Sequence, residues 1–94
     1  MSQSVLCDAI RRKHVVQFSY KGTTRTAEPH AVGYDGSGDL TLSAWQLSGG
    51  SGTGWRDFHV SKLSALSTTA RTFARARPGY NPNDRTLVRI LCRL

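Results

Sequence analysis

The sequence predicts a mainly β fold: five short strands that form a small barrel or a strongly bent sheet, with an N-terminal helix and a short C-terminal helix. Short strand-like runs follow one another between residues 15 and 69, and turns rich in Gly, Asp and Ser separate them. A chain of 94 residues buries one modest core. Barrel closure would remove the exposed edges of such short strands. We therefore expect one domain over residues 1–94, with the core barrel at about 15–69 and an extension at 70–94.

A helix is expected at about residues 4–13. Its apolar residues recur at helical spacing: Val5, Leu6, Ala9 and Ile10. Ser2 or Ser4 can cap the N-terminus, and the basic residues 11–13 fall in the last turn, where cations interact favourably with the helix dipole. A helix this short is not stable alone, so its apolar stripe must dock on the rest of the domain.

Five strands are predicted after this helix. The segments with a strand pattern are residues 15–20, 25–34, 40–47, 55–60 and 64–69. Pro29 interrupts the second one, and because proline donates no ladder hydrogen bond it belongs at an edge or a bulge. The glycine-rich residues 49–54 are interpreted as a hairpin loop, because Trp55 and Arg56 stand where a phosphate-binding P-loop requires Lys and Ser or Thr.

The C-terminal segment allows two interpretations. Asn81 followed by Pro82 is typical of a helix cap and a first helical position, which favours a helix over the last residues. The alternative is a strand, since apolar residues alternate with others: Val88, Ile90, Cys92 and Leu94. We expect the helix, on the strength of the cap.

The charge balance indicates an anionic partner. Lys and Arg number 13 against 6 Asp and Glu, which gives a formal charge of +7, and ten of these cations are arginines. Six of the ten lie in the last third of the chain: Arg71, Arg75, Arg77, Arg85, Arg89 and Arg93. The planar guanidinium group suits phosphate and stacks on bases, so a nucleic acid or nucleotide is the expected ligand. Solubility alone is the competing interpretation.

Several functions are not expected. No nucleophile-elbow pattern is present, the carboxylates are scattered, and His14, His30 and His59 lack ligand spacing. We therefore predict no catalytic residue, enzyme activity, cofactor or metal site. There is no run of 18 apolar residues and no signal-peptide pattern, so we expect no membrane partner and a cytoplasmic location. Cys7 and Cys92 are more often buried small apolar residues than a bridge in a cytosolic chain, so we predict no disulfide, although the two could approach each other if the terminal segments pack together.

Six segments, in this order and spacing, resemble a known family. They are residues 9–12 (AIRR), 16–20 (VQFSY), 25–30 (RTAEPH), 39–45 (DLTLSAW), 56–63 (RDFHVSKL) and 72–73 (TF). Together they resemble the WYL domain, a ligand-sensing module of bacterial and phage regulators. The chain departs from the family where Leu40 and Thr41 replace Trp and Tyr, and where His59 and Lys62 replace arginines. It also contains no helix-turn-helix, the DNA-binding unit of the larger members.

The resemblance implies a five-stranded Sm-like (Src-homology-3-like) small barrel whose basic pocket binds single-stranded DNA, RNA or a nucleotide. Carried over by position, the ligand-binding residues are Arg25, His30, Arg56, His59 and Lys62, with Tyr20 and Trp45 as walls. We expect a non-catalytic regulatory module. The alternative is a protein-interaction module that docks on a larger effector or regulator, or forms a homodimer, through the helix at 4–13 and the tail at 82–94.

Overall fold

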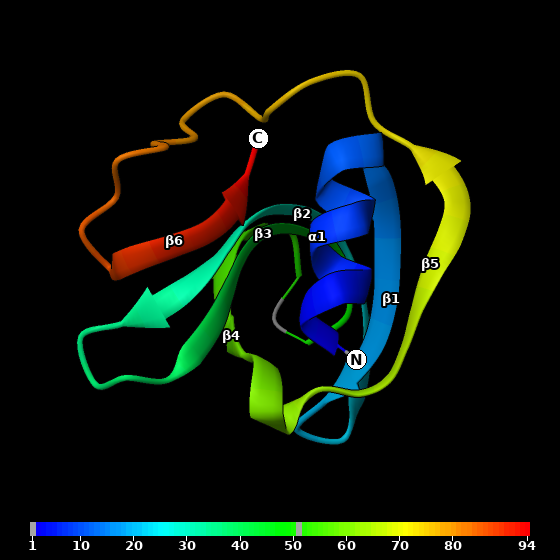
Figure 1. Cartoon of the computed structure of the whole chain (residues 1–94). Coiled ribbons are helices and arrows are strands. Elements are labelled where there is room, and N and C mark those ends of the chain that lie inside the picture. Colours follow the sequence, from blue (N-terminus) through cyan, green and yellow to red (C-terminus); the bar gives the residue numbers. More distant parts are fainter. Residues whose placement is uncertain (1, 51) are drawn as a thin grey trace.

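A computed structural model describes residues 2–50 and 52–94 as one helix packed on a six-stranded antiparallel sheet (Figure 1). The elements are α1 (Ser2–Arg12), β1 (His14–Tyr20), β2 (Thr23–Asp35), β3 (Leu40–Ser48), β4 (Gly54–His59), the 3-10 turn η1 (Val60–Lys62), β5 (Ser64–Thr72) and β6 (Leu87–Arg93). The predicted helix and five strands are present, and their bounds differ from the expected ones by at most three residues. The mainly β fold with an N-terminal helix is therefore confirmed.

The sheet is open rather than closed into the expected barrel. Its strand order is β4-β3-β2-β1-β5, and within residues 2–50 and 52–94 the two end strands, β4 and β5, do not pair. The long strand β2 pairs with β1 over residues 23–27 and with β6 over residues 31–35, both on the edge opposite β3. Pro29 lies beside a register shift on the β3 side, which confirms its expected place at a bulge.

The expected C-terminal helix is wrong, because residues 87–93 form strand β6. The residue expected to cap that helix closes a turn instead: Asn81 Oδ1 accepts a hydrogen bond from the backbone N–H of Asn83 at 3.0 Å. Strand pairing wins because β1 leaves the second half of one β2 edge uncovered, and β6 satisfies the backbone donors and acceptors there.

The main core lies between α1 and the inner face of the sheet. Its buried apolar residues include Leu6, Ala9, Ile10, Val16, Phe18, Ala27, Val32, Leu42, Ala44 and Phe58. Phe18 and Phe58 meet edge to face, with ring centroids 4.9 Å apart. The apolar stripe predicted for the helix is therefore the face that docks.

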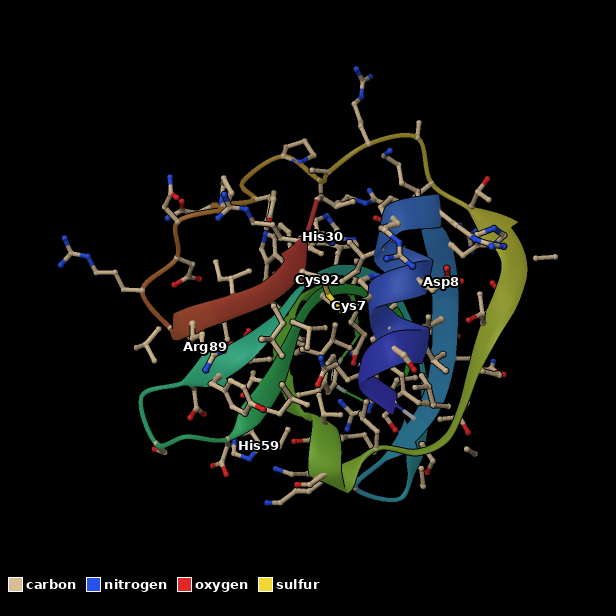
Figure 2. The ribbon with its side chains drawn as sticks, in the orientation of Figure 1. Cys7, Asp8, His30, His59, Arg89 and Cys92 are labelled. Carbon is tan, nitrogen blue, oxygen red and sulfur yellow. A yellow bond between two sulfur atoms is a disulfide. The ribbon has the colours of Figure 1, made fainter. Side chains whose placement is uncertain are left out.

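Cys7 and Cys92 form a disulfide between α1 and β6, contrary to the expectation that they stay unbridged (Figure 2). Their Cα atoms lie 5.7 Å apart although 85 positions separate them in the sequence. The pairing of β6 with β2 carries Cys92 to the helix, and the helix packs against β6. This tertiary placement is what the local sequence could not indicate.

Candidate functional site

The residues predicted to bind the ligand lie in four places. Arg25 lies over the Tyr20 ring and is linked to Arg56 through Gln46 and Gly52. His30 and Trp45 lie in an outer aromatic cluster, His59 lies between two aspartates, and Lys62 is exposed in η1. Strand alternation explains the separation, because an odd number of positions along a strand changes the face of the sheet. Arg25 and His30 are five positions apart on β2, and Arg56 and His59 are three apart on β4.

Arg25 is held on the inner side of the sheet. Its Nη1 donates to Gln46 Oε1 at 3.2 Å and its Nη2 to the Tyr20 carbonyl at 3.4 Å. The guanidinium carbon lies 5.5 Å from the centroid of the Tyr20 ring and 5.9 Å from that of Phe58. Its Nε is buried and has no hydrogen-bond partner among the described residues. Arg25 therefore keeps one donor unused, and the acceptors of its other hydrogen bonds are neutral.

Arg56 is linked to Arg25 and contacts the glycine-rich segment after β3. Its Nη1 donates to the Trp55 carbonyl at 2.8 Å and its Nη2 to the Gly52 carbonyl at 3.3 Å. Gln46 Nε2 donates to that Gly52 carbonyl at 2.5 Å, while Gln46 Oε1 accepts from Arg25. The buried Gln46 side chain thus links the two predicted arginines, and this link was missed in the sequence.

His30 is a buried structural residue on the outer side of the sheet. Its Nε2 accepts a hydrogen bond from the Arg77 backbone N–H at 3.0 Å, so Nδ1 carries the proton and donates to the Glu28 carbonyl at 2.8 Å. The ring contacts three aromatic side chains: Trp55, Phe73 and Tyr80. With Trp45, these residues form the outer aromatic cluster, which fastens the C-terminal extension to the sheet.

Trp45 is covered by an internal cation. The Arg77 guanidinium carbon lies 5.4 Å from its ring centroid. Arg77 also donates two hydrogen bonds to the buried Glu28 carboxylate, from Nε to Oε1 at 2.8 Å and from Nη2 to Oε2 at 3.1 Å. The position of a cation over the Trp45 face is therefore filled from within the chain.

We expect the burial of neutral His30 to make the fold less stable in mild acid. Burial lowers the pKa of His30 below 6.5, so the unfolded chain binds a proton that the native state does not. The free energy of unfolding that neutral His30 contributes is fully present above pH 6.5. It is lost as the pH falls below 6.5, by up to about 1.4 kcal/mol per pH unit. Urea unfolding at pH 7.5 and pH 5.0, on wild type and His30→Gln, measures it. An equal pH dependence of the two proteins contradicts the assignment.

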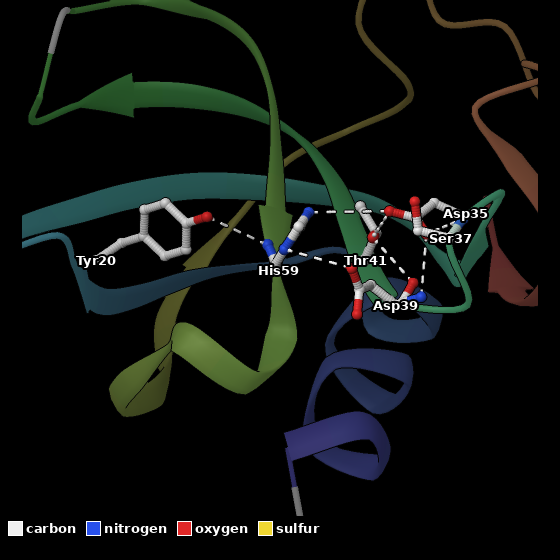
Figure 3. Close-up of polar contacts among 6 residues, drawn as sticks. All are labelled: Tyr20, Asp35, Ser37, Asp39, Thr41 and His59. Atoms are coloured by element: carbon white, nitrogen blue, oxygen red, sulfur yellow. Dashed lines mark hydrogen bonds and ion pairs between the residues drawn. The ribbon is translucent and has the colours of Figure 1, made fainter.

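His59 lies between the carboxylates of Asp35 and Asp39 (Figure 3). Its Nε2 is 3.8 Å from Asp35 Oδ2, and its Nδ1 is 3.9 Å from Asp39 Oδ2. Asp35 Oδ1 accepts hydrogen bonds from the backbone N–H groups of Ser37 at 2.9 Å and Asp39 at 3.0 Å, and Oδ2 accepts one from Thr41 Oγ1 at 3.4 Å. These bonds lower the pKa of Asp35 and keep it ionised.

The same three side chains offer one ligand atom each within 4.8 Å of one another. Nitrogen and carboxylate oxygen are ligands that a divalent transition metal accepts. The distances also fit a structural polar cluster of His59 with the two carboxylates, without a metal. The register that sets Thr41 opposite His59 creates this cluster, and no local sequence spacing indicated it.

A pocket of about 290 Å³ lies between β3, β4 and the C-terminal extension. Its lining consists of Ser43, Trp55, Arg56, Asp57, Gly79, Tyr80, Asn81 and Asp84, so one arginine lies beside the two carboxylates. Burial and the nearby Asp84 carboxylate raise the pKa of Asp57. We call this the β4 pocket. The sequence indicated Trp55 and the predicted ligand residue Arg56 here, but it did not indicate the pocket itself, because tertiary packing brings residues 79–84 to β4.

A comparison of the chain with family models, curated proteins and solved structures found no match. The resemblance to the WYL domain therefore depends on the six quoted segments alone, and it stays a prediction from the sequence.

Proposed function

We propose that this protein is a non-catalytic binding module for single-stranded nucleic acid or a related polyanion. The observation that carries the proposal is a set of five exposed arginines on β5, the C-terminal extension and β6. This arginine band consists of Arg71, Arg75, Arg85, Arg89 and Arg93, of which Figure 2 labels Arg89. Across the described parts of the chain, none of the five forms an ion pair with a carboxylate.

Most of the acidic side chains are engaged elsewhere. Asp8 pairs with arginines of α1 at 3.2 and 3.3 Å, and Glu28 pairs with Arg77 at 2.8 Å. Asp35 and Asp39 lie beside a histidine at the β2–β3 turn. The ion pairs of these carboxylates therefore leave the charge of the five arginines in the arginine band without an acidic partner among the described residues. A phosphate backbone binds such a surface mainly by releasing its counterions.

The resemblance to the WYL domain extends the proposed interface to Arg25 and Arg56 beside the 49–54 loop. Arg25 supports this extension, because its acceptors are neutral and its Nε is a buried donor without a partner among the described residues. We also propose that the architecture of this sheet is related to the Sm-like small barrel. In its support, β1 to β4 form a meander and β5 returns beside β1, an order from which a small barrel closes.

We expect Arg85→Ala with Arg89→Ala to weaken the binding of a fluorescein-labelled 15-nucleotide single strand by about tenfold. The slope of log affinity against log salt should fall by about 1.4, since two phosphate contacts are lost. Anisotropy titrations between 50 and 200 mM NaCl measure both. Arg11→Ala with Arg12→Ala is the matched control, because it removes the same charge from α1. If both double variants lose the same affinity, the effect comes from net charge and not from the arginine band. If wild type does not bind the strand at 50 mM NaCl, the proposal is wrong.

The cytoplasmic location is also a proposal. Among the described residues, no helix has the length and apolar character needed to cross a membrane. The Cys7–Cys92 disulfide weighs against the cytoplasm, because such bonds persist mainly in oxidising compartments. Counting free thiols in protein trapped with an alkylating agent inside living cells decides between the two.

A protein-interaction role is the second candidate, and β6 favours it. This strand pairs only with β2 in the described structure, so its other edge has no strand partner there, and Val88 on β6 is 68% exposed. An open strand edge can accept a strand from a partner or from a second copy. Light scattering across a range of protein concentrations distinguishes a homodimer from a monomer that binds only nucleic acid.

A further inference from the structure

We infer that the β4 pocket is a base-binding site that prefers guanine, an inference that rests on the proposed nucleic-acid function. The pocket has a volume of about 290 Å³, close to the lower end of the roughly 300–1,000 Å³ usual for small-molecule sites. It therefore suits a single nucleotide and not a large cofactor.

Two aromatic side chains form one side of the pocket. The rings of Trp55 and Tyr80 stack at 28°, with their centroids 6.1 Å apart, and both line the pocket. The centroid of the His30 ring lies 4.9 Å from that of Trp55 and 5.0 Å from that of Tyr80, so the buried histidine packs against both rings and holds them in place. Aromatic faces held in place in this way are the surfaces on which proteins stack unpaired bases.

The polar lining selects among the bases. Asp57 and Asp84 place carboxylates in the pocket, and an ionised carboxylate only accepts hydrogen bonds. Guanine alone presents two adjacent N–H donors, N1–H and the N2 amino group, to one carboxylate. Adenine and cytosine present one amino group beside an acceptor, and uracil presents one N–H between two acceptors. In each of these bases an acceptor would face a carboxylate oxygen.

Two further features of the pocket fit guanine, one through its N–H donors and one through its acceptor O6. Burial raises the pKa of Asp57, the nearby Asp84 carboxylate raises it further, and N–H donors between the two carboxylates would relieve their repulsion. The Tyr80 hydroxyl oxygen is buried and has no hydrogen-bond partner among the described residues. Guanine O6 would give this hydroxyl an acceptor where a small shift of the ring exposes it.

The rim of the pocket is positive. Arg93 Nη1 donates to the Pro82 carbonyl at 3.0 Å, and its charge acts on Tyr80 by lowering the pKa that burial raises. Arg85 is exposed and follows Asp84 directly. Both arginines belong to the arginine band. A nucleotide whose base lies in the pocket would thus have its phosphate beside the arginine band. Carboxylates and aromatic faces could also bind an organic cation, but the nearby arginines would repel such a ligand.

Isothermal titration with GMP, AMP, CMP and UMP at 50 mM NaCl tests the inference. We expect GMP to bind at least about tenfold more tightly than the other three, as one bidentate base contact implies. Asp57→Asn should abolish this preference, because its amide nitrogen would set a donor against the donors of guanine. Asp8→Asn, which removes a carboxylate from α1, is the matched control and should retain the preference. Asp84→Asn provides a second pocket variant if Asp57→Asn fails to fold.

Three outcomes overturn the inference. Equal affinities for the four nucleotides, with salt-dependent oligonucleotide binding retained, remove the guanine site and leave the proposed function standing. If spermidine shifts the NMR resonance of the Trp55 indole N–H and GMP does not, the pocket binds cations and not guanine. A preference for GMP that survives in both Asp57→Asn and Asp84→Asn places guanine elsewhere. Loss of oligonucleotide binding of every sequence would instead count against the proposed function.

Discussion

Replacing Cys7 and Cys92 by serine is expected to lower the free energy of unfolding by about 4 kcal/mol. The disulfide joins residues 85 positions apart, so it restricts almost the whole unfolded chain. In the chain-entropy account this restriction is worth about 3 kcal/mol for a 15-residue loop and about 4.7 kcal/mol for a 100-residue loop. A domain of this size has a total stability of roughly 5–14 kcal/mol, so the bond supplies a large share of it.

Thermal and urea unfolding of wild type and of Cys7→Ser with Cys92→Ser measure this effect. The melting temperature should fall by roughly 15–30 °C. Adding a reductant should lower the stability of wild type by a similar amount and leave the serine variant unchanged, which serves as the control. Two free thiols in the native protein, or a melting temperature indifferent to reductant, would contradict the prediction.

Gly33→Ala is expected to separate β6 from β2, at a cost of about 3 kcal/mol. A Cβ atom at Gly33 would lie 2.4 Å from the Arg89 carbonyl oxygen and 3.0 Å from Ile90 Cα. Both are backbone atoms of a paired strand, so no side chain can move aside to make room. The expected loss therefore combines steric overlap with the hydrogen bonds that β6 makes to β2.

Chemical unfolding measures the decrease in the free energy of unfolding. Amide hydrogen exchange shows which strand loses its hydrogen bonds. Exchange should accelerate in β6 and stay slow in β1, which pairs with a different part of β2. Gly36→Ala is the matched control, because nothing lies within 4 Å of a Cβ atom there. If the two alanine variants are equally stable, β6 does not pack against Gly33 as described.

The sequence predicted those elements whose pattern is local. The helical spacing around Leu6 and the alternation in β1 to β5 are properties of neighbouring residues, and both are reflected in the structure. The C-terminal strand depended on an uncovered β2 edge about 55 residues earlier. Asn81 does form a turn with Asn83, but a turn can precede either a helix or a strand. It therefore could not decide the structure of residues 87–93. The disulfide was missed for the same reason, since Cys92 reaches Cys7 only through β6.

The candidate site was predictable in part. Alternation along β2 already separates Arg25 from His30, and the sequence therefore contained the signal that these two residues face opposite sides. The convergence of Arg25 and Arg56 on one loop follows from the order of the strands, which the sequence does not state. The β4 pocket depends on Asp84 meeting Asp57 across 27 positions that include β5 and the irregular residues 73–84, and no periodic pattern reports such a contact.

The bond between α1 and β6 also turns most of the molecule into a covalent ring. All residues between Cys7 and Cys92 belong to this ring. A protease that cuts once inside the ring leaves two chains that remain tied together and share one sheet. Such a nicked molecule runs as a single species until the sulfur–sulfur bond is reduced, so one cleavage event releases no fragment.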